Sequence, residues 1–143
     1  MTDCTMKHEG AADETICAIL SQFRRIAIVG LSEKPWRASH RVAAYLVEQG
    51  YDIIPVNPQI KAILGMASYP NLVSAPGPVE VVNVFRRVEH IPEIVEQAVE
   101  IGARAVWMQS GLEHRQAAEL AQRAGLLVVM NRCIMVEHGL HFG

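Results

Sequence analysis

Positive charge follows a short, mostly apolar segment that ends in a glycine. Residues 25–29 lead into Gly30, and the polar stretch beyond it carries Lys34, Arg37 and two further basic residues. Where a strand turns into a helix, the unpaired first amides and the positive end of the helix dipole favour an anion. Lysine and arginine donate strong hydrogen bonds to phosphate oxygens. The pattern therefore predicts a phosphate-binding turn for a nucleotide-containing ligand.

The spacing after Gly30 discriminates among nucleotides. A dinucleotide fingerprint needs two further glycines and an acidic residue about 20 positions on. The glycine positions hold Ser32 and Pro35 here, and the next expected strand ends at Asn57, so NAD is disfavoured. Without the acid, the nearby cations suit a phosphorylated ribose, as in NADP and coenzyme A. Because NADP also needs the close backbone approach of the missing glycines, the sequence favours coenzyme A.

Alternating strand-like and helix-like segments must position this turn. Helical apolar spacing begins at Asp13, and later helices are expected to stop at Gly50, Gly102 and Gly125, each followed by a strand. The expected strands are 25–29, 51–56, 80–85, 105–108 and 126–130. Such alternation produces right-handed crossovers and a parallel sheet covered on both faces.

We therefore expect an α/β fold: a single doubly wound, Rossmann-like domain at 13–143, with a mostly parallel five-stranded sheet flanked by helices. Residues 1–12 are expected to be loosely ordered. The segment 59–78 should be an irregular connection with a short strand or turn near 62–67 and at most one turn of helix.

In such a sheet the ligand lies beyond the carboxyl ends of the strands, at the point where the strand order reverses. Ser39 is expected to cap the second helix there. The predicted binding residues are Gly30, Leu31, Ser32, Lys34, Pro35, Arg37, Ser39, Val56, Asn57, Pro58, Phe85, Arg86, Arg87 and Gln109.

Composition excludes several classes of function. A net charge of −2 over 143 residues disfavours a nucleic-acid surface, and we expect neither a membrane span nor a secretion signal. Cys4, Cys17 and Cys133 are few and widely spaced, which predicts reduced thiols and a cytoplasmic location. His138 and His141 match no closed zinc spacing with Cys133, and the tail is expected to be mobile, so we predict no metal site.

Six motifs, taken together in order, resemble the small stand-alone CoA-binding proteins, which are related to the CoA-binding domain of the succinyl-CoA synthetase α subunit. They are Val29-Gly30-Leu31-Ser32, Ile54-Pro55-Val56-Asn57-Pro58, Ile63-Leu64-Gly65, Val84-Phe85-Arg86-Arg87, Val106-Trp107-Met108-Gln109 and Asn131-Arg132-Cys133. The resemblance covers about 23–138. It implies a Rossmann-like domain that binds the ADP part of CoA and has no established catalysis of its own.

This resemblance has two limits. Family members often read Asp-Arg-Cys-Pro where this chain has Asn131-Arg132-Cys133-Ile134, so no role for a carboxylate at position 131 carries over. The synthetase's second domain has no counterpart in the matched region, so ligase activity does not carry over either.

The comparable synthetase cysteine is expected near the CoA thiol. Our hypothesis is that Cys133 forms a mixed disulfide with bound CoA, against the alternative of an inert structural thiol.

For the CoA reading we predict a role for each group. Amides of 31–33 and the helix near Ser39 hold the pyrophosphate. Lys34, Arg37 and one of Arg86 or Arg87 neutralise the other phosphate charge. Adenine or ribose is flanked by Val56, Pro58 and Phe85.

Three classes of function stay open from sequence. The first is a non-catalytic CoA or acyl-CoA binding protein, with a homodimer as an open alternative to a monomer. The second is an enzyme: the CoA-binding half of an acyl-CoA ligase acting with another chain, or an NADP-linked oxidoreductase. The third is an interaction protein with a vestigial pocket. Nucleotide preference separates them.

Overall fold

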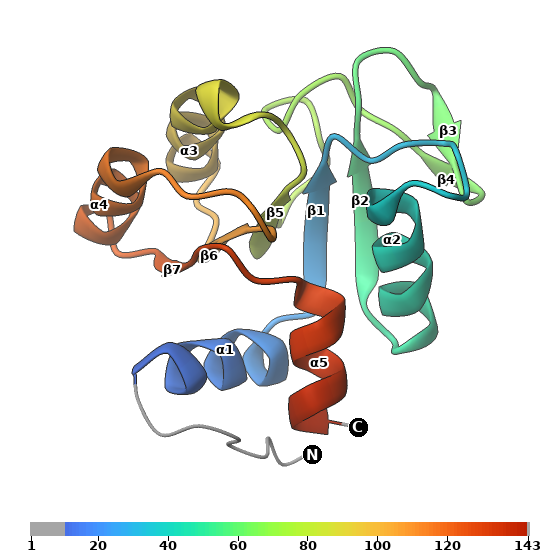
Figure 1. Cartoon of the computed structure of the whole chain (residues 1–143). Coiled ribbons are helices and arrows are strands. Elements are labelled where there is room, and N and C mark those ends of the chain that lie inside the picture. Colours follow the sequence, from blue (N-terminus) through green and yellow to red (C-terminus); the bar gives the residue numbers. More distant parts are fainter. Residues whose placement is uncertain (1–10, 143) are drawn as a thin grey trace.

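The computed structural model describes residues 11–142 of the chain as one layered α/β unit (Figure 1). Its helices are α1 (Ala11–Gln22), α2 (Ala38–Glu48), α3 (Ile91–Glu100), α4 (Arg115–Arg123) and α5 (Ile134–Phe142), with a 3₁₀ turn η1 (Val88–His90). Its strands are β1 (Arg25–Val29), β2 (Asp52–Val56), β3 (Ala62–Ile63), β4 (Met66–Ala67), β5 (Val81–Val84), β6 (Ala105–Met108) and β7 (Leu127–Val129). None of the described helices is long and apolar enough to cross a membrane.

The main sheet has five parallel strands in the order β2-β1-β5-β6-β7. This confirms the doubly wound Rossmann-like prediction, and each expected strand agrees with the observed one to within a residue at either end. The winding direction reverses between β1 and β5, where Val29 pairs with both Val56 and Val84. Open sheets of this kind bind ligands at that reversal point, at the carboxyl ends of the strands.

Two layers of helices cover the sheet. On one face, α1, α2 and α5 bury Ile16, Leu46 and Ile134 against Ile26 and Ile28 of β1. On the other face, α3 and α4 pack against the alternate strand residues, and Figure 1 shows these two helices together on one side. Because β5 and β6 are buried along their whole length, their sequences do not alternate between apolar and polar residues; β6 is entirely apolar, and β5 is apolar except for the buried Asn83.

The first helix, α1, begins two residues earlier than expected. The predicted loosely ordered segment 1–12 lies outside the described residues except for Ala11 and Ala12, which start α1. The irregular connection at 59–78 holds the small antiparallel hairpin β3–β4, which agrees with the expected short strand or turn.

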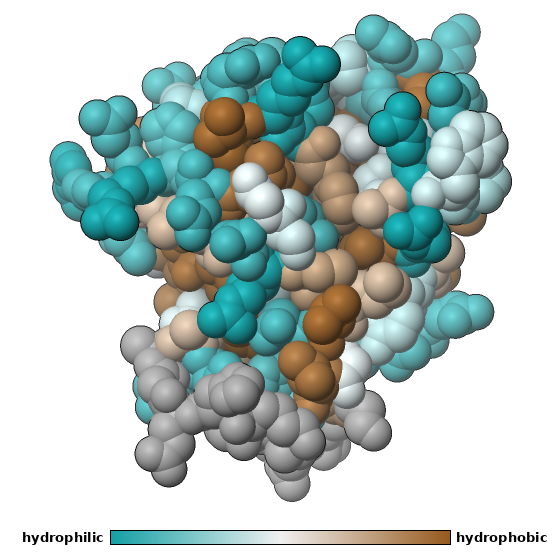
Figure 2. Space-filling model, viewed as in Figure 1, coloured by the Kyte–Doolittle hydropathy of each residue, from teal (hydrophilic) through white to brown (hydrophobic). Residues whose placement is uncertain are grey.

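The carboxyl end differs from the prediction of a mobile tail. Residues Ile134–Phe142 form α5, which packs beside α1 and α2. Ile134 and His141 are almost fully buried, whereas Val136 and Leu140 are exposed and give α5 an apolar outer surface (Figure 2). The helix was missed because its mixture of histidines, glycine and apolar residues lacks a clear helical period; its hydrophobic groups point both inward and outward.

The cysteines also differ in part from expectation. Cys133 is a free thiol, but Cys17 is disulfide-bonded. The prediction of uniformly reduced cysteines was therefore wrong, and cysteine usage loses weight as an argument for a cytoplasmic location.

Candidate nucleotide-binding site

Gly30 joins the carboxyl ends of three strands. Its amide donates to the carbonyl of Val56 at 2.9 Å, and the amide of Phe85 donates to the carbonyl of Val29 at 2.8 Å. Gly30 has a φ of 92°, and a Cβ built on it would lie 2.8 Å from the Phe85 carbonyl oxygen. A side chain is excluded here by both conformation and space, so the glycine allows the turn to lie directly against β5.

Internal hydrogen bonds hold the loop after β1 in place. The amide of Ser32 donates to the hydroxyl of Ser39 at 3.0 Å, and the amide of Lys34 donates to the hydroxyl of Ser32 at 3.1 Å. From the end of β2, Asn57 donates its side-chain amide to the carbonyl of Leu31 at 2.9 Å. The loop is therefore preformed by serine and asparagine side chains.

The prediction that Ser39 caps α2 was wrong. The residue in the N-cap position is Arg37, without a side-chain cap, and Ser39 lies inside the first turn with its hydroxyl turned back to the loop. Tertiary contact with Ser32 replaces the local capping bond, which sequence could not reveal. One consequence is that the Ser32 amide, expected to hold phosphate, already has a partner.

Other amides at this turn are available. Among the described residues, the backbone amides of Leu31, Glu33, Ala38 and Ser39 donate to no protein acceptor. The last two are the first amides of α2, where the helix dipole is positive. An anion at this turn would therefore meet unpaired donors.

Three neighbouring hollows surround these groups. The first, of about 270 Å³, is the phosphate hollow, with Lys34 and Arg37 at its exposed edge. Its wall also includes Gly30, Ser32, Ala38, Ser39 and Phe85. The ammonium group of Lys34 lies 5.9 Å from the ring centre of Trp36, an exposed aromatic residue that the sequence reading left out.

The second, the nucleoside hollow, has about 260 Å³ and lies between β2, the irregular connection and α3. Its wall contains the predicted Val56, Pro58 and Arg86. It also contains residues that sequence reasoning missed: Pro70, Asn71, Leu72, His90, Glu93, Ile94 and Gln97. No local motif marks them, because folding of the connection over the sheet is what brings them to the site.

The third hollow has about 420 Å³, and we call it the arm hollow after the thiol-bearing arm of the CoA that the sequence predicts. It shares Ala38 and Phe85 with the first hollow and Arg86 with the second. The rest of its wall is Arg87, Gln109, Ser110, Leu112 and Cys133. Arg86 is half-buried and Arg87 exposed, and both line it, although the sequence predicts that only one faces the site. The strand has ended by this point, so strict alternation no longer separates adjacent side chains.

Three predicted residues lie outside the walls of these hollows. Leu31 is fully buried in the core, Pro35 is exposed on the loop, and Asn57 uses its side chain to hold the loop. Their contribution is to the shape of the turn. Trp107, which belongs to one of the family motifs, is fully buried, and its indole N–H donates to the carbonyl of Arg132 at 2.8 Å.

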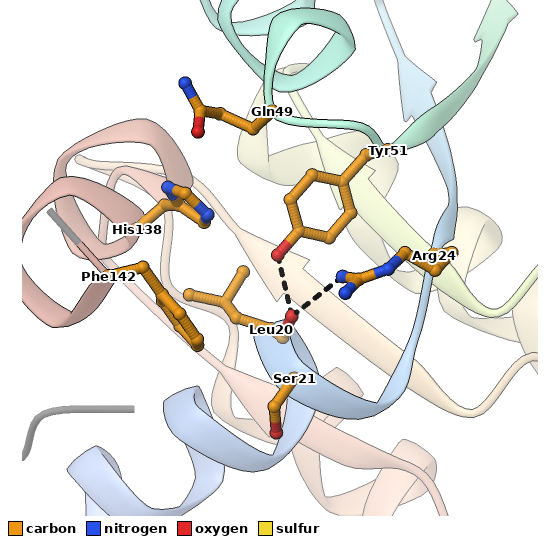
Figure 3. Close-up of a pocket in the computed structure, with 7 residues that line it drawn as sticks. All are labelled: Leu20, Ser21, Arg24, Gln49, Tyr51, His138 and Phe142. Atoms are coloured by element: carbon orange, nitrogen blue, oxygen red, sulfur yellow. Dashed lines mark hydrogen bonds between the residues drawn. The ribbon is translucent and has the colours of Figure 1, made fainter. Parts of the chain in front are cut away.

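A separate pocket of about 370 Å³ lies near the amino ends of β1 and β2, away from the strand ends that bear the cations (Figure 3). Tyr51 donates to the carbonyl of Leu20 at 2.6 Å, and Arg24 donates to the same oxygen at 3.4 Å. Burial lowers the pKa of His138 in its wall, with a smaller contribution from the charge of Arg24. These groups bind one another and join α1, α2 and α5, so we interpret the pocket as a packing junction.

The histidine-rich tail forms a different cluster from the one that the sequence suggested. His141 Nε2 lies 3.4 Å from Glu137 Oε1 and 3.9 Å from Asp13 Oδ1, and all three residues are buried. Cys133, considered from sequence as their partner, lies instead in the arm hollow. The cluster links α5 to α1.

Comparison with known proteins shows the family and the fold. Residues 24–139 match the family described as CoA binding domain. The uncharacterized protein YneT of Bacillus subtilis is 42% identical over 122 residues, or 85% of this chain and 90% of that protein. A hypothetical protein of Pyrococcus horikoshii has a solved structure with 43% identity and a TM-score of 0.90, covering 94% of each chain.

Two further structures extend the likeness. A protein of Thermus thermophilus has 34% identity and a TM-score of 0.84, covering 90% of this chain and 98% of its own. A dinucleotide-forming acetyl-coenzyme A synthetase of Ca. Korarchaeum cryptofilum has 20% identity and a TM-score of 0.65, covering 73% of this chain and 25% of its own, and this shows likeness of fold alone. The match over most of its length shows that the chain belongs to the CoA-binding domain family.

Proposed function

We propose that this protein binds coenzyme A, or an acyl-CoA, through its ADP moiety and without catalysing a reaction of its own. The observation that carries the proposal is the preformed turn at Gly30, where unpaired amides, the start of α2 and two cations meet at the strand-order reversal. Membership of the CoA-binding domain family supports the same ligand.

Each part of the ligand has a matching region. The pyrophosphate fits the phosphate hollow, where Lys34, Arg37 and the neighbouring Arg86 supply positive charge. Adenine and ribose fit the nucleoside hollow beside Val56 and Pro58, which give apolar contact. The pantetheine arm would then extend through the arm hollow, whose wall is partly apolar.

Titration calorimetry tests the ligand. We expect CoA to bind more tightly than dephospho-CoA, because the 3′-phosphate adds charge-assisted hydrogen bonds, and both to bind more tightly than NADP. Tighter binding of NADP would favour an oxidoreductase, and absence of binding to all three would leave an interaction protein. Turnover of acyl-CoA only when a partner chain is added would support the ligase half.

Charge-removing variants test the site. Combined Arg37→Ala and Arg86→Ala should weaken CoA binding by about tenfold or more, since a hydrogen bond to a charged group is worth ~1.5–3 kcal/mol. Arg123→Ala is the matched control, because that side chain is 77% exposed at the far end of α4. Equal affinity of the double variant and the control would refute the assignment.

Two broader expectations belong to the same proposal. We propose a cytoplasmic location, which subcellular fractionation would test. A homodimer remains the alternative to a monomer, and light scattering of the purified protein at several concentrations decides between them.

A further inference from the structure

Gln109, at the carboxyl end of β6, is a buried polar residue in the wall of the arm hollow. It is 5% exposed, yet it lines the arm hollow together with Cys133. Its side-chain oxygen accepts from the backbone amide of Ile134 at 3.0 Å and from the side chain of Asn83 at 3.0 Å. Both donors come from other elements, α5 and β5, so the side chain is held from two sides.

The orientation of this amide follows from its partners. The backbone N–H of Ile134 can only donate, so the Gln109 atom facing it must be the oxygen. The Nε2 amino group is then directed away from that contact, and it makes no hydrogen bond with any described residue. Among the described residues, the side-chain atom that is both fully buried and without a partner is Asn83 Oδ1. Gln109 Nε2 also lacks a partner but is not such an atom, so it must be accessible from the hollow.

The side-chain oxygen of Asn83 is left without a hydrogen-bond partner by this arrangement. Its Nδ2 donates to Gln109 and, at 3.3 Å, to the carbonyl of Trp107, both of which are acceptors. The amide therefore cannot rotate to satisfy its oxygen, which stays buried without a partner. Buried unpaired polar atoms are rare and destabilising, and proteins retain them chiefly where they serve a site.

We propose that the Gln109 Nε2 group is a fixed donor to a carbonyl oxygen at the thiol end of the ligand, and that Asn83 is its positioning residue. This inference rests on the proposed CoA function, which places the arm in the same hollow as Gln109 and Cys133. Two carbonyls have the required chemistry: the thioester carbonyl of an acyl-CoA and the last amide carbonyl of the pantetheine arm.

Binding of four ligands distinguishes between the two candidate carbonyl groups. Acetyl-CoA has both carbonyls, S-ethyl-CoA and free CoA have only those of the arm, and 3′-phospho-ADP has neither. The variant Gln109→Glu keeps the oxygen that faces Ile134 and Asn83 but replaces the donor with a second oxygen. Gln122→Glu on the exposed side of α4 is the matched control. Calorimetry is run at about pH 8, well above the ordinary carboxyl pKa of about 4.3, to favour the ionised form of the introduced side chain.

We expect Gln109→Glu to weaken acetyl-CoA binding roughly three- to tenfold and to leave 3′-phospho-ADP unchanged. A loss confined to acetyl-CoA identifies the thioester carbonyl, whereas an equal loss for all three CoA forms identifies the arm amide. Unchanged affinity for every CoA form overturns the inference. Failure of the unmutated protein to bind either CoA or 3′-phospho-ADP would instead defeat the proposed function.

Asn83→Leu tests the positioning role by a different readout. It removes the unpaired oxygen together with the bond to Gln109, so the melting temperature should stay the same or rise while acetyl-CoA binding weakens several-fold. A purely structural asparagine would show the reverse, a lower melting temperature with unchanged affinity, and that result would exclude the positioning role.

Discussion

Gly30 illustrates how one residue couples local conformation to the site. Its positive φ and its contact with the Phe85 carbonyl bring β1, β2 and the phosphate turn to one point. Gly50 has the same φ of 92° but nothing within 4 Å of an added Cβ. The two glycines therefore separate conformational strain from steric exclusion.

We predict that Gly30→Ala lowers the free energy of unfolding by about 2–4 kcal/mol, from left-handed strain and overpacking together. Gly50→Ala should cost only the strain, ~1–2 kcal/mol. Urea denaturation measures both. Equal losses in the two variants would mean that the backbone at Phe85 yields to a methyl group.

Cys133 allows a test of the proposed site by the chemistry of a single residue. It is a half-buried free thiol in the wall of the arm hollow. We predict that CoA disulfide forms a mixed disulfide with Cys133: its thiolate attacks one sulfur, and the other CoA leaves as a thiolate, so electrons balance. Intact mass should show one CoA adduct that Cys133→Ser abolishes; an unmodified wild-type chain would contradict the idea.

His138 should make stability depend on pH. Burial, aided by Arg24, lowers its pKa in the folded chain below the ordinary 6.5. Between the folded-state pKa and pH 6.5, the unfolded chain therefore binds more protons than the folded chain. The contribution of His138 to the free energy of unfolding is fully present above pH 6.5 and is lost as the pH falls through the folded-state pKa. Between about pH 8 and about pH 5, His138→Gln should lose less unfolding free energy than the wild type. Parallel pH profiles in urea denaturation would contradict this.

Among the elements, α5 depends most on tertiary contacts. Its histidines meet groups on other helices, and the Tyr45 hydroxyl on α2 lies 2.8 Å from His138 Nδ1. His138 also stacks on Phe142 with ring centres 5.0 Å apart. The start of α5 is fixed by Gln109, so packing of this helix and the geometry of the arm hollow are linked.

We predict that Tyr45→Phe destabilises the fold by about 0.5–1.5 kcal/mol, because it removes the bond between α2 and α5. Tyr69→Phe is the control, since that hydroxyl bonds to none of the described residues. Thermal unfolding followed by circular dichroism gives both values. If the control loses as much, the hydrogen bond is not the cause.

At the scale of the whole molecule, the strand order accounts for the position of the candidate site. Reversal of winding between β1 and β5 leaves a space that helices on neither face close, and all three hollows border it. A ligand spanning them would contact the strand ends, α2, α3 and the start of α5. Binding should therefore stabilise the domain as a unit.

We predict that CoA at 100 times its dissociation constant raises unfolding free energy by about 2.7 kcal/mol, and Tm by roughly 5–10 °C. Differential scanning fluorimetry measures the shift. The Arg37→Ala, Arg86→Ala double variant should show a much smaller one at the same concentration. An unmoved Tm for the wild type at saturating CoA would contradict the proposed function.

The sequence by itself determined the five main strands, the four helices before α5, and the edge of the sheet that bears the candidate site. Apolar runs and the glycines at 50, 102 and 125 act over neighbouring residues, so strands and helices could be predicted almost to their ends. Parallel topology then predicted the edge that bears the candidate site, because the carboxyl ends of all strands meet there.

Only the tertiary structure decided which atoms at that edge are available. Ser39 turned from a helix cap into a loop anchor through Ser32, and the orientation of Gln109 depends on Asn83 and Ile134, 26 and 25 residues away. Such contacts leave no local pattern, because they arise when distant segments pack and their polar groups must find partners. The same reason explains α5, whose helical form depends on packing against α1 and α2.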